Sequence, residues 1–136
     1  MQTEIDRAAV VRTLRHELGE RLLAIYAFGS RIAGQARQDS DLDLAVLLAG
    51  KADPVELWNL AQALAVTLDL DVDLIDLRDA STVMQYRVIT SGKRWWTRDT
   101  QADLFEAFVL NDKTALDEAR APLMADIERE GRVHGR

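Results

Sequence analysis

Four stretches of the chain have the length and character of β-strands. In the first two, apolar residues follow one another almost without interruption, and short continuous runs of this kind are typical of strands buried inside a sheet. The third stretch alternates apolar residues with aspartates, and the fourth is rich in aromatic residues that favour strands. The sequence therefore predicts strands over residues 22–28, 42–48, 70–77 and 93–97.

Segments with helical periodicity separate these runs. Apolar residues three and four positions apart fall on one face of a helix, and this spacing predicts a first helix over about residues 3–18. A second helix should begin after Asp53, because this cap, Pro54 in the first turn and Glu56 three residues after the cap are agreeing start signals. It should run to about Leu68. Two further helical segments are expected over about residues 80–92 and 99–130.

Strands that alternate with helices indicate an α/β fold. We expect a small mixed β-sheet of four strands, flanked by helices on one face and open to ligands on the face that carries the carboxylates. With 136 residues the chain should form a single domain, residues 1–136, with a core over about residues 20–97 and a C-terminal helical segment. The apolar stripe of that segment has two interpretations that stay open: it closes the domain's own core, or it docks the helices of a partner.

The chain is acidic, with 23 Asp and Glu residues against 17 Lys and Arg, a net charge of −6 and a sequence pI of about 4.9. Nonspecific nucleic-acid binding depends on neutralising phosphates, so direct contact with nucleic acid is not expected, whereas a basic protein partner would fit. The chain has no cysteine, which is compatible with a reducing cytosol and excludes a thiolate metal site. No apolar stretch approaches membrane-spanning length, so we expect a cytoplasmic protein without membrane contact.

The candidate chemistry begins where the first strand ends, at Phe28-Gly29-Ser30. Gly29 can supply a positive φ angle or allow close approach of another part of the chain. Ser30 then falls at a turn from strand to helix, where its hydroxyl and the unpaired N–H groups of a helix start can meet an anionic oxygen. This arrangement suits the phosphates of a nucleotide.

Two aspartates follow after ten intervening residues, at the start of the second strand. Asp41 and Asp43 are two positions apart, so they should project from the same face of a strand with Cα atoms roughly 6.5 Å apart. Their oxygens could converge on one hard cation or on a pair of Mg²⁺ ions about 3.5–4 Å apart, as nucleotidyl transfer requires. A third carboxylate is expected from the next strand, where Asp73 would share their face if Val72 and Leu74 pack under the helices.

That next strand carries two aspartates besides Asp73. Asp71 lies nearer the strand entrance and is interpreted as a solvated acid, and Asp76 is interpreted as a cap or ion-pair partner at the strand exit. Carboxylates gathered on one face repel one another and are tolerated best when a metal neutralises them. Because of this repulsion, Asp73, which should face Asp41 and Asp43, is interpreted as part of a metal site rather than as a solvent-exposed acid.

The spacing from Gly29-Ser30 to Asp41-Leu42-Asp43 resembles the signature of the nucleotidyltransferase superfamily of DNA polymerase beta. With the chain length and the later acidic strand, it is similar to the minimal nucleotidyltransferases (MNT), and within them to the MntA-type antitoxins of HEPN–MNT toxin–antitoxin systems. The resemblance covers most of residues 20–97. It implies ATP as substrate and Mg²⁺ as cofactor. It also implies a set of site residues: Asp41, Asp43 and Asp73 as catalytic and metal-binding residues, and Gly29, Ser30 and Arg31 at the phosphates.

The sequence does not decide which basic residue binds the triphosphate. Many minimal members carry an arginine directly before the loop glycine, whereas here Ala33 precedes Gly34 and the arginine stands earlier. The basic pair on the last strand lies next to aromatic residues and could bind a nucleotide, but it equally fits a charged edge that prevents unwanted strand pairing. Four candidates therefore remain: Arg31, Arg37, Lys93 and Arg94.

The resemblance implies an enzyme that transfers AMP from ATP to a tyrosine hydroxyl of a cognate HEPN ribonuclease toxin. Adenylation would silence the toxin, and the two proteins would form a hetero-oligomeric complex. Two alternatives stay open at this stage. One is a non-catalytic antitoxin that masks the toxin by binding, and the other is a nucleotidyltransferase acting on a small molecule such as an aminoglycoside.

Overall fold

A four-stranded sheet forms the centre of the protein, and the computed structural model describes residues 5–32 and 41–112. The strands follow the order β3-β2-β1-β4. In chain order they are β1 (Leu22–Phe28), β2 (Leu42–Leu48), β3 (Val72–Asp76) and β4 (Lys93–Thr97). β1 is antiparallel to both of its neighbours, while β2 and β3 are parallel. The mixed α/β sheet expected from the sequence is confirmed.

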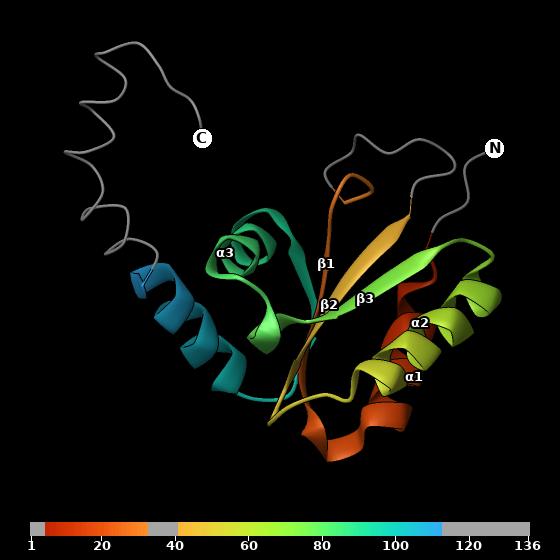
Figure 1. The fold of residues 1–136 in the computed structure, drawn as a ribbon, viewed down its shortest axis with the longest axis horizontal. Coiled ribbons are helices and arrows are strands. Elements are labelled where there is room, and N and C mark those ends of the chain that lie inside the picture. The colour runs from red at the N-terminus through yellow and green to blue at the C-terminus, as the bar shows by residue number, and fades with distance from the viewer. Residues whose placement is uncertain (1–4, 33–40, 113–136) are drawn as a thin grey trace, which may run out of the picture.

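Helices pack on this sheet from two sides. Three of them have both ends in the described residues: α1 (Arg7–Leu18), α2 (Pro54–Leu68) and α3 (Thr82–Ser91). A further helical stretch, called helix 101–112, follows β4. Figure 1 shows α1 and α2 on one side of the sheet and α3 with helix 101–112 on the other. Within residues 5–32 and 41–112, no helix combines the length and the apolar character needed to cross a lipid bilayer.

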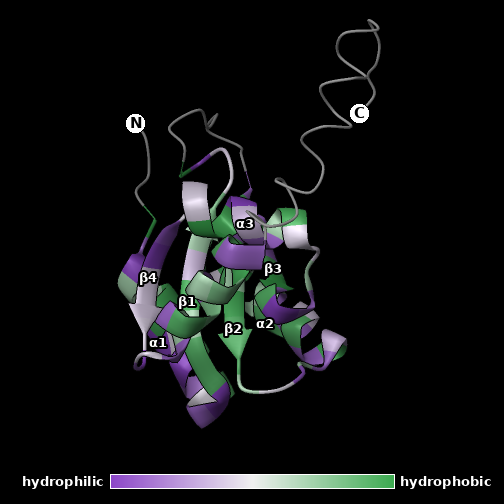
Figure 2. Cartoon of the chain, turned by 90° about the vertical axis from the view of Figure 1, so that its left-hand side faces the viewer, coloured by the Kyte–Doolittle hydropathy of each residue, from purple (hydrophilic) through white to green (hydrophobic). Residues whose placement is uncertain are grey.

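The covering of both faces corrects the expectation that helices flank one face only. Alternate side chains of β1 and β2 enter two separate apolar clusters, one with α1 and α2 and the other with α3 and helix 101–112. All seven residues of β1 are buried, and Figure 2 shows β2 hydrophobic along most of its length. A strand that is apolar on both faces needs a layer on each. The carboxylates therefore lie at one end of the sheet rather than on an open face.

α1 begins later than the expected helix over residues 3–18. The carboxylate of Asp6 accepts a hydrogen bond from the backbone N–H of Ala9 at 3.0 Å. This bond makes Asp6 the cap, so the first helical residue is Arg7. Residues 3 and 4 lie outside the described part of the chain.

β3 is shorter at both ends than the expected strand over residues 70–77. At its entrance, Asp69 adopts a left-handed conformation with φ of +59° and ends α2. At its exit, the carboxylate of Asp76 accepts a hydrogen bond from the backbone N–H of Arg78 at 3.1 Å and starts a short 3-10 helix. The capping role expected for Asp76 is confirmed.

An irregularity in β4 sorts its side chains between the two faces. Ile25 of β1 pairs with Trp96 and the next residue, Tyr26, pairs with Arg94, which leaves Trp95 as an extra residue. A bulge of this kind redirects neighbouring side chains. Both tryptophans consequently pack against the cluster of α1 and α2, while Arg94 reaches the opposite face.

Helix 101–112 closes the second cluster and is held there by a polar network. The Tyr26 hydroxyl donates a hydrogen bond to the Glu106 carboxylate at 2.6 Å, and Arg94 donates to the same carboxylate at 3.0 Å and to Asp103 at 2.7 Å. Burial, and then the bond to Glu106, raises the pKa of Tyr26. Ala102 of this helix is fully buried. Of the two interpretations of the C-terminal helical segment, closure of the domain's own core therefore applies to residues 101–112.

Loss of the Tyr26 hydroxyl should destabilise the fold without changing the catalytic activity. In Tyr26→Phe the carboxylate of Glu106 loses a partly buried donor, and we expect a loss of about 1–2 kcal/mol in the free energy of unfolding. Urea denaturation of variant and wild type would measure it. An unchanged midpoint would show that the hydroxyl does not hold helix 101–112 in place.

Candidate active site

Three strands bring one row of side chains together at the end of the sheet. In the register of the sheet, Asp43 of β2 pairs with Phe28 of β1 on one side and with Asp73 of β3 on the other. Paired residues on neighbouring strands point to the same face. Asp43 and Asp73 therefore lie side by side, as expected from the alternation of β3. Asp41 directly precedes β2 and adds its charge to the same place.

Gly29 serves both purposes expected of it, a positive φ and a close approach. Its φ is +86°, a region that side-chain-bearing residues rarely adopt. A Cβ atom at this position would also collide with the carboxylate of Asp43. The turn after β1 therefore passes directly over the aspartate, and a ligand held by that turn lies next to the carboxylate.

The environment of Asp43 opposes its negative charge. Burial is the main cause of a raised pKa for this carboxyl, and the nearby charges of Asp73 and Asp41 raise it further. Phe28 supplies part of the apolar surroundings as its direct neighbour across the strands. Arg87 is the group that acts in the opposite direction and lowers the pKa. The site thus concentrates negative charge where a cation would relieve it.

The donor chemistry of these aspartates fits a hard divalent cation. Mg²⁺ prefers carboxylate oxygens and is bound through one or two of them together with substrate phosphates. Among the described residues, no group of three Asp, Glu, His or Cys side chains is already gathered closely enough to enclose a metal. Asp41, Asp43 and Asp73 lie at the same end of the sheet without forming such a group.

The other residues assigned to the phosphates lie where the turn leaves β1. Ser30 is exposed in the turn, and Arg31 follows it in a partly exposed position. Both are therefore at the end of the sheet that carries the aspartates. The helix expected after Ser30, and Arg37 with it, fall outside the described residues.

The basic pair on β4 is less suited to the triphosphate. Arg94 is engaged by Asp103 and Glu106, and these bonds also raise its pKa. Lys93 pairs with Ala27, whose side chain packs in the cluster of α1 and α2. Lys93 therefore shares the face opposite to Asp43. β4 is an edge strand, so the interpretation as a charged edge fits both residues.

Arg87 is the residue that sequence reasoning missed. It lies on α3 next to Val88, which is buried in the same cluster as Phe28. At the end of α3, a Cβ atom on Gly92 would lie 3.1 Å from the Cβ of Phe28, so this end of the helix packs tightly against the end of β1. The guanidinium of Arg87 is exposed, and among the described residues it has no ion pair within 4.0 Å. In the sequence, Arg87 could have been noticed as a basic residue beside the apolar stripe of the helix that follows β3.

Asp71 stands apart from the row of acids. It is exposed and precedes β3, and its backbone carbonyl accepts a hydrogen bond from Leu42 at 2.9 Å. The structure thus places it at the strand entrance, as expected for a solvated acid. Asp73 is the acid of β3 that lies in register with Asp43.

Comparison with known proteins finds sequence matches over most of the chain. The family model described as polymerase beta nucleotidyltransferase matches residues 10–101. Protein adenylyltransferase MntA of Shewanella oneidensis is 37% identical over 124 residues, which are 91% of this chain and 88% of that protein. The segment matched by the family model contains every residue placed at the site, from Gly29 to Arg87.

Solved structures agree with the sequence comparison. A crystal structure of a toxin–antitoxin complex with AMP-PNP contains a chain that matches with a TM-score of 0.80 at 37% identity, over 91% of this chain and 99% of that one. A structure of the tri-AMPylated Shewanella oneidensis HEPN toxin in complex with the MNT antitoxin matches with a TM-score of 0.72 at 36% identity. That match covers 90% of this chain and 95% of the other.

Proposed function

This chain belongs to the polymerase beta nucleotidyltransferase family, and we propose that it transfers AMP from ATP to a tyrosine hydroxyl of a cognate HEPN ribonuclease toxin. The modified toxin would be silenced, so the chain acts as an antitoxin. The observation that carries the proposal is the register of the sheet, which sets Asp43 beside Asp73 directly under the turn at Gly29. The toxin complexes of the similar proteins support the choice of acceptor.

The chemistry is a single displacement at phosphorus. The tyrosine oxygen attacks the α-phosphorus of ATP, the bond from that phosphorus to the oxygen bridging to the β-phosphate breaks, and pyrophosphate leaves with that oxygen. Asp73 takes the proton of the attacking hydroxyl. Gly29 and Ser30 hold the β- and γ-phosphates through the turn, and Arg31 and Arg87 offset their charge. Because ATP is the proposed substrate, we expect the reaction to take place in the cytoplasm.

Asp41, Asp43 and Asp73 are the residues that would hold Mg²⁺, which when bound supplies charge neutralisation at the triphosphate and a lower pKa for the attacking hydroxyl. The aspartates themselves orient the reacting groups, since β2 and β3 fix their relative positions. Positioning and charge stabilisation are the main contributions that a protein makes in phosphoryl chemistry.

Intact mass spectrometry of the toxin tests the proposal. The purified chain is incubated with ATP, Mg²⁺ and the cognate toxin, and the toxin should gain mass in whole adenylate units. A parallel reaction with the toxin's tyrosines changed to phenylalanine should show no gain. A toxin whose mass is unchanged by the wild-type chain would reject the proposal.

Arg87 should contribute to nucleotide binding. In Arg87→Ala we expect the KM for ATP to rise about tenfold with little change in kcat, because a charge that offsets the phosphates is lost at an exposed position. Arg87→Lys should recover part of the loss. Lys51→Ala, which removes an exposed charge from the loop after β2, is the matched control. An Arg87→Ala variant with wild-type kinetics would remove Arg87 from the site.

A further inference from the structure

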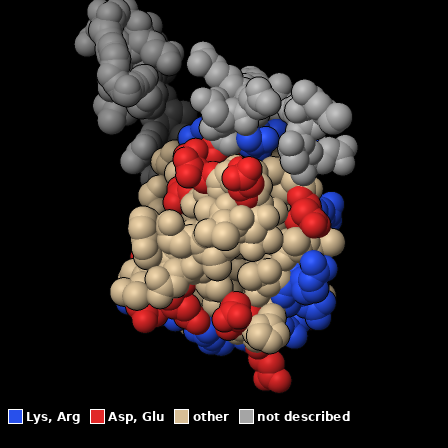
Figure 3. Space-filling view, turned by 90° about the vertical axis from the view of Figure 1, so that its right-hand side faces the viewer, with Lys and Arg blue, Asp and Glu red and all other residues tan. Residues whose placement is uncertain are grey.

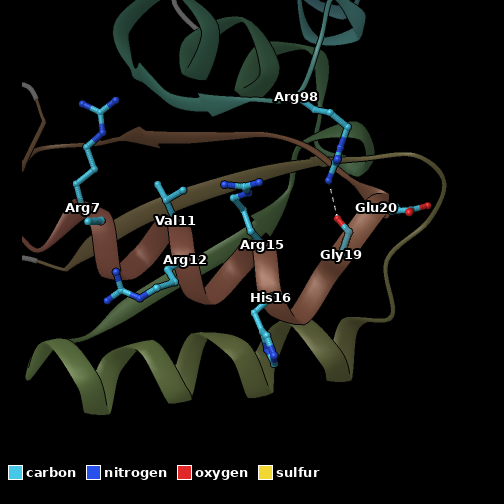
Figure 4. Close-up of a pocket in the computed structure, with 9 residues that line it drawn as sticks. Arg7, Val11, Arg12, Arg15, His16, Gly19, Glu20 and Arg98 are labelled. Carbon is cyan, nitrogen blue, oxygen red and sulfur yellow. Dashed lines mark hydrogen bonds between the residues drawn. The ribbon is translucent and has the colours of Figure 1, made fainter.

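The side of α1 that faces β4 carries a groove that the proposed reaction does not use. Four arginines line it, from α1 and from the residue after β4, against a single carboxylate, Glu20. Figure 4 shows Arg7, Val11 and Arg15 pointing to one side of α1, and Arg98 reaching from the opposite wall to the carbonyl of Gly19. Arg12 points away from that side of the helix. We call this surface the basic groove, and its arginines are Arg7, Arg12, Arg15 and Arg98.

Aromatic rings and carbonyls hold most of these guanidinium groups in place. The guanidinium of Arg7 lies 5.8 Å from the ring centre of Trp95, and those of Arg15 and Arg98 lie 4.8 and 5.3 Å from the ring centre of Trp96. Arg98 also donates hydrogen bonds of 2.9 Å to the carbonyls of Leu22 and Gly19. Both rings are available to α1 because the bulge in β4 turns them to this face.

The charge of the basic groove is not neutralised within the described part of the protein. Carboxylates pair with Arg21 and Arg94 elsewhere on the surface. Across residues 5–32 and 41–112, none lies within 4.0 Å of a groove arginine. Figure 3 shows a group of basic side chains along the right side of the face that it draws. A fixed positive surface on a chain of net charge −6 is suited to an anionic partner.

The groove favours a protein segment over a nucleic acid. Guanidinium groups already lie over Trp95 and Trp96, so these rings do not offer open stacking faces to bases. Ala8 is exposed and Val11 partly exposed between the arginines, and such apolar floor matches an amphipathic segment better than a phosphate backbone. Arg7 and Arg15 are eight residues apart, about 12 Å along the helix, which suits two or more carboxylates on one short segment.

The position of the groove suits an acceptor that is itself a protein. A turn of three residues, Gly19–Arg21, joins α1 to β1, so the Arg7 end of α1 lies toward the end of the sheet where Gly29 follows β1 (Figure 1). The acceptor needs contacts beyond the few residues that hold the nucleotide. A segment seated in the groove would anchor it on a surface that starts at the catalytic end of the molecule.

We propose that the basic groove docks an acidic, amphipathic segment of the toxin and so determines which protein is adenylated. This inference rests on the proposed function for the identity of the partner. Docking through charged groups speeds association and selects partners more than it alters the chemical step. Variants of the groove should therefore change toxin affinity and the KM for toxin while leaving kcat unchanged.

Charge reversal at Arg12 tests the docking surface, because Arg12 is exposed and its loss disturbs neither tryptophan. We expect Arg12→Glu to weaken toxin binding about tenfold and Arg12→Glu/Arg15→Glu at least about a hundredfold, with a smaller dependence of affinity on salt. Lys51→Glu makes the same change of charge outside the groove and should bind the toxin as the wild type does. Isothermal titration calorimetry at two salt concentrations gives the affinities, and circular dichroism checks that each variant is folded.

The design separates this inference from the proposed function. Toxin affinity is measured without ATP, and adenylation is measured separately by intact mass. Equal toxin affinity of wild type and both groove variants would overturn the docking proposal even if the toxin is adenylated. Binding of labelled single-stranded RNA or duplex DNA that is lost in Arg12→Glu, with toxin affinity unchanged, would overturn it in favour of a nucleic acid. A wild-type chain that binds the toxin through the groove but leaves its mass unchanged would reject only the proposed function.

Discussion

Asp43→Asn should abolish AMP transfer and at the same time make the metal-free protein more stable. The carboxylate is the middle member of the row that joins β1, β2 and β3, so its loss should lower the rate of toxin adenylation at least about a thousandfold. Stability should change in the opposite direction, because burial and the charges of Asp73 and Asp41 raise the pKa of this carboxyl. Its ionised form is therefore costly in the fold, and asparagine removes that cost.

The pH dependence of the stability follows from the same shift. A carboxyl whose pKa is higher in the folded than in the unfolded protein favours folding when it is protonated, so the wild type gains stability as the pH falls toward that raised pKa. The asparagine variant does not titrate. The melting temperature of Asp43→Asn should accordingly exceed that of the wild type by the largest amount near neutral pH. This difference should shrink as the pH falls toward the usual pKa range of an aspartate. Thermal melts in the presence of a chelator, from pH 8 to pH 4, would measure it.

Asp71→Asn is the control for this experiment. It removes an exposed carboxylate from the entrance of β3, outside the row, and activity should stay within a few-fold of the wild type. An Asp43→Asn chain that still protects cells from the toxin would instead favour the antitoxin that masks its partner by binding. A variant that keeps adenylating the toxin would remove Asp43 from the chemistry altogether.

The row of acids could be predicted from the sequence because it depends on a single local rule. Residues two apart on a strand share a face, so Asp41 and Asp43 are expected on one face once their strand is identified. By the same rule, Asp73 lies on the face opposite to Val72 and Leu74. The glycine turn was also predictable, since Gly29 ends an apolar run of strand length. What the rule does not give is which strands are neighbours. The pairing of β2 with β3 comes from the fold.

Two of the three features that were missed depend on contacts between distant segments. The unbroken apolar run of β1 is itself a signal that both faces of the sheet are covered, and the expectation of helices on one face overlooked it. Arg87 reaches the site only because α3 packs against the end of β1. The extra residue at Trp95 is a matter of pairing between β1 and β4, and no pattern within Lys93–Thr97 shows it. Sequence periodicity describes each element, whereas the position of Arg87 and the extra residue at Trp95 depend on how elements meet.

Gly29→Ala is the second change with a large expected effect. The added Cβ would sit at a φ of +86° and collide with the carboxylate of Asp43, so the turn and the aspartate cannot both keep their positions. We expect AMP transfer to fall at least about a hundredfold, as displacements of about 1 Å do in positioned sites. The unfavourable backbone conformation should add a loss of about 1–2 kcal/mol in the free energy of unfolding.

Gly50 separates the two causes. It also has a positive φ, of +117°, but an added Cβ would meet nothing within 4 Å. Gly50→Ala should therefore lose stability to a similar degree and keep full activity, because only the backbone strain is shared. Initial rates of toxin adenylation and urea denaturation of both variants give the comparison. If Gly29→Ala lost no more activity than Gly50→Ala, the close contact between the turn and Asp43 would have no part in catalysis, and the phosphates would have to be held elsewhere.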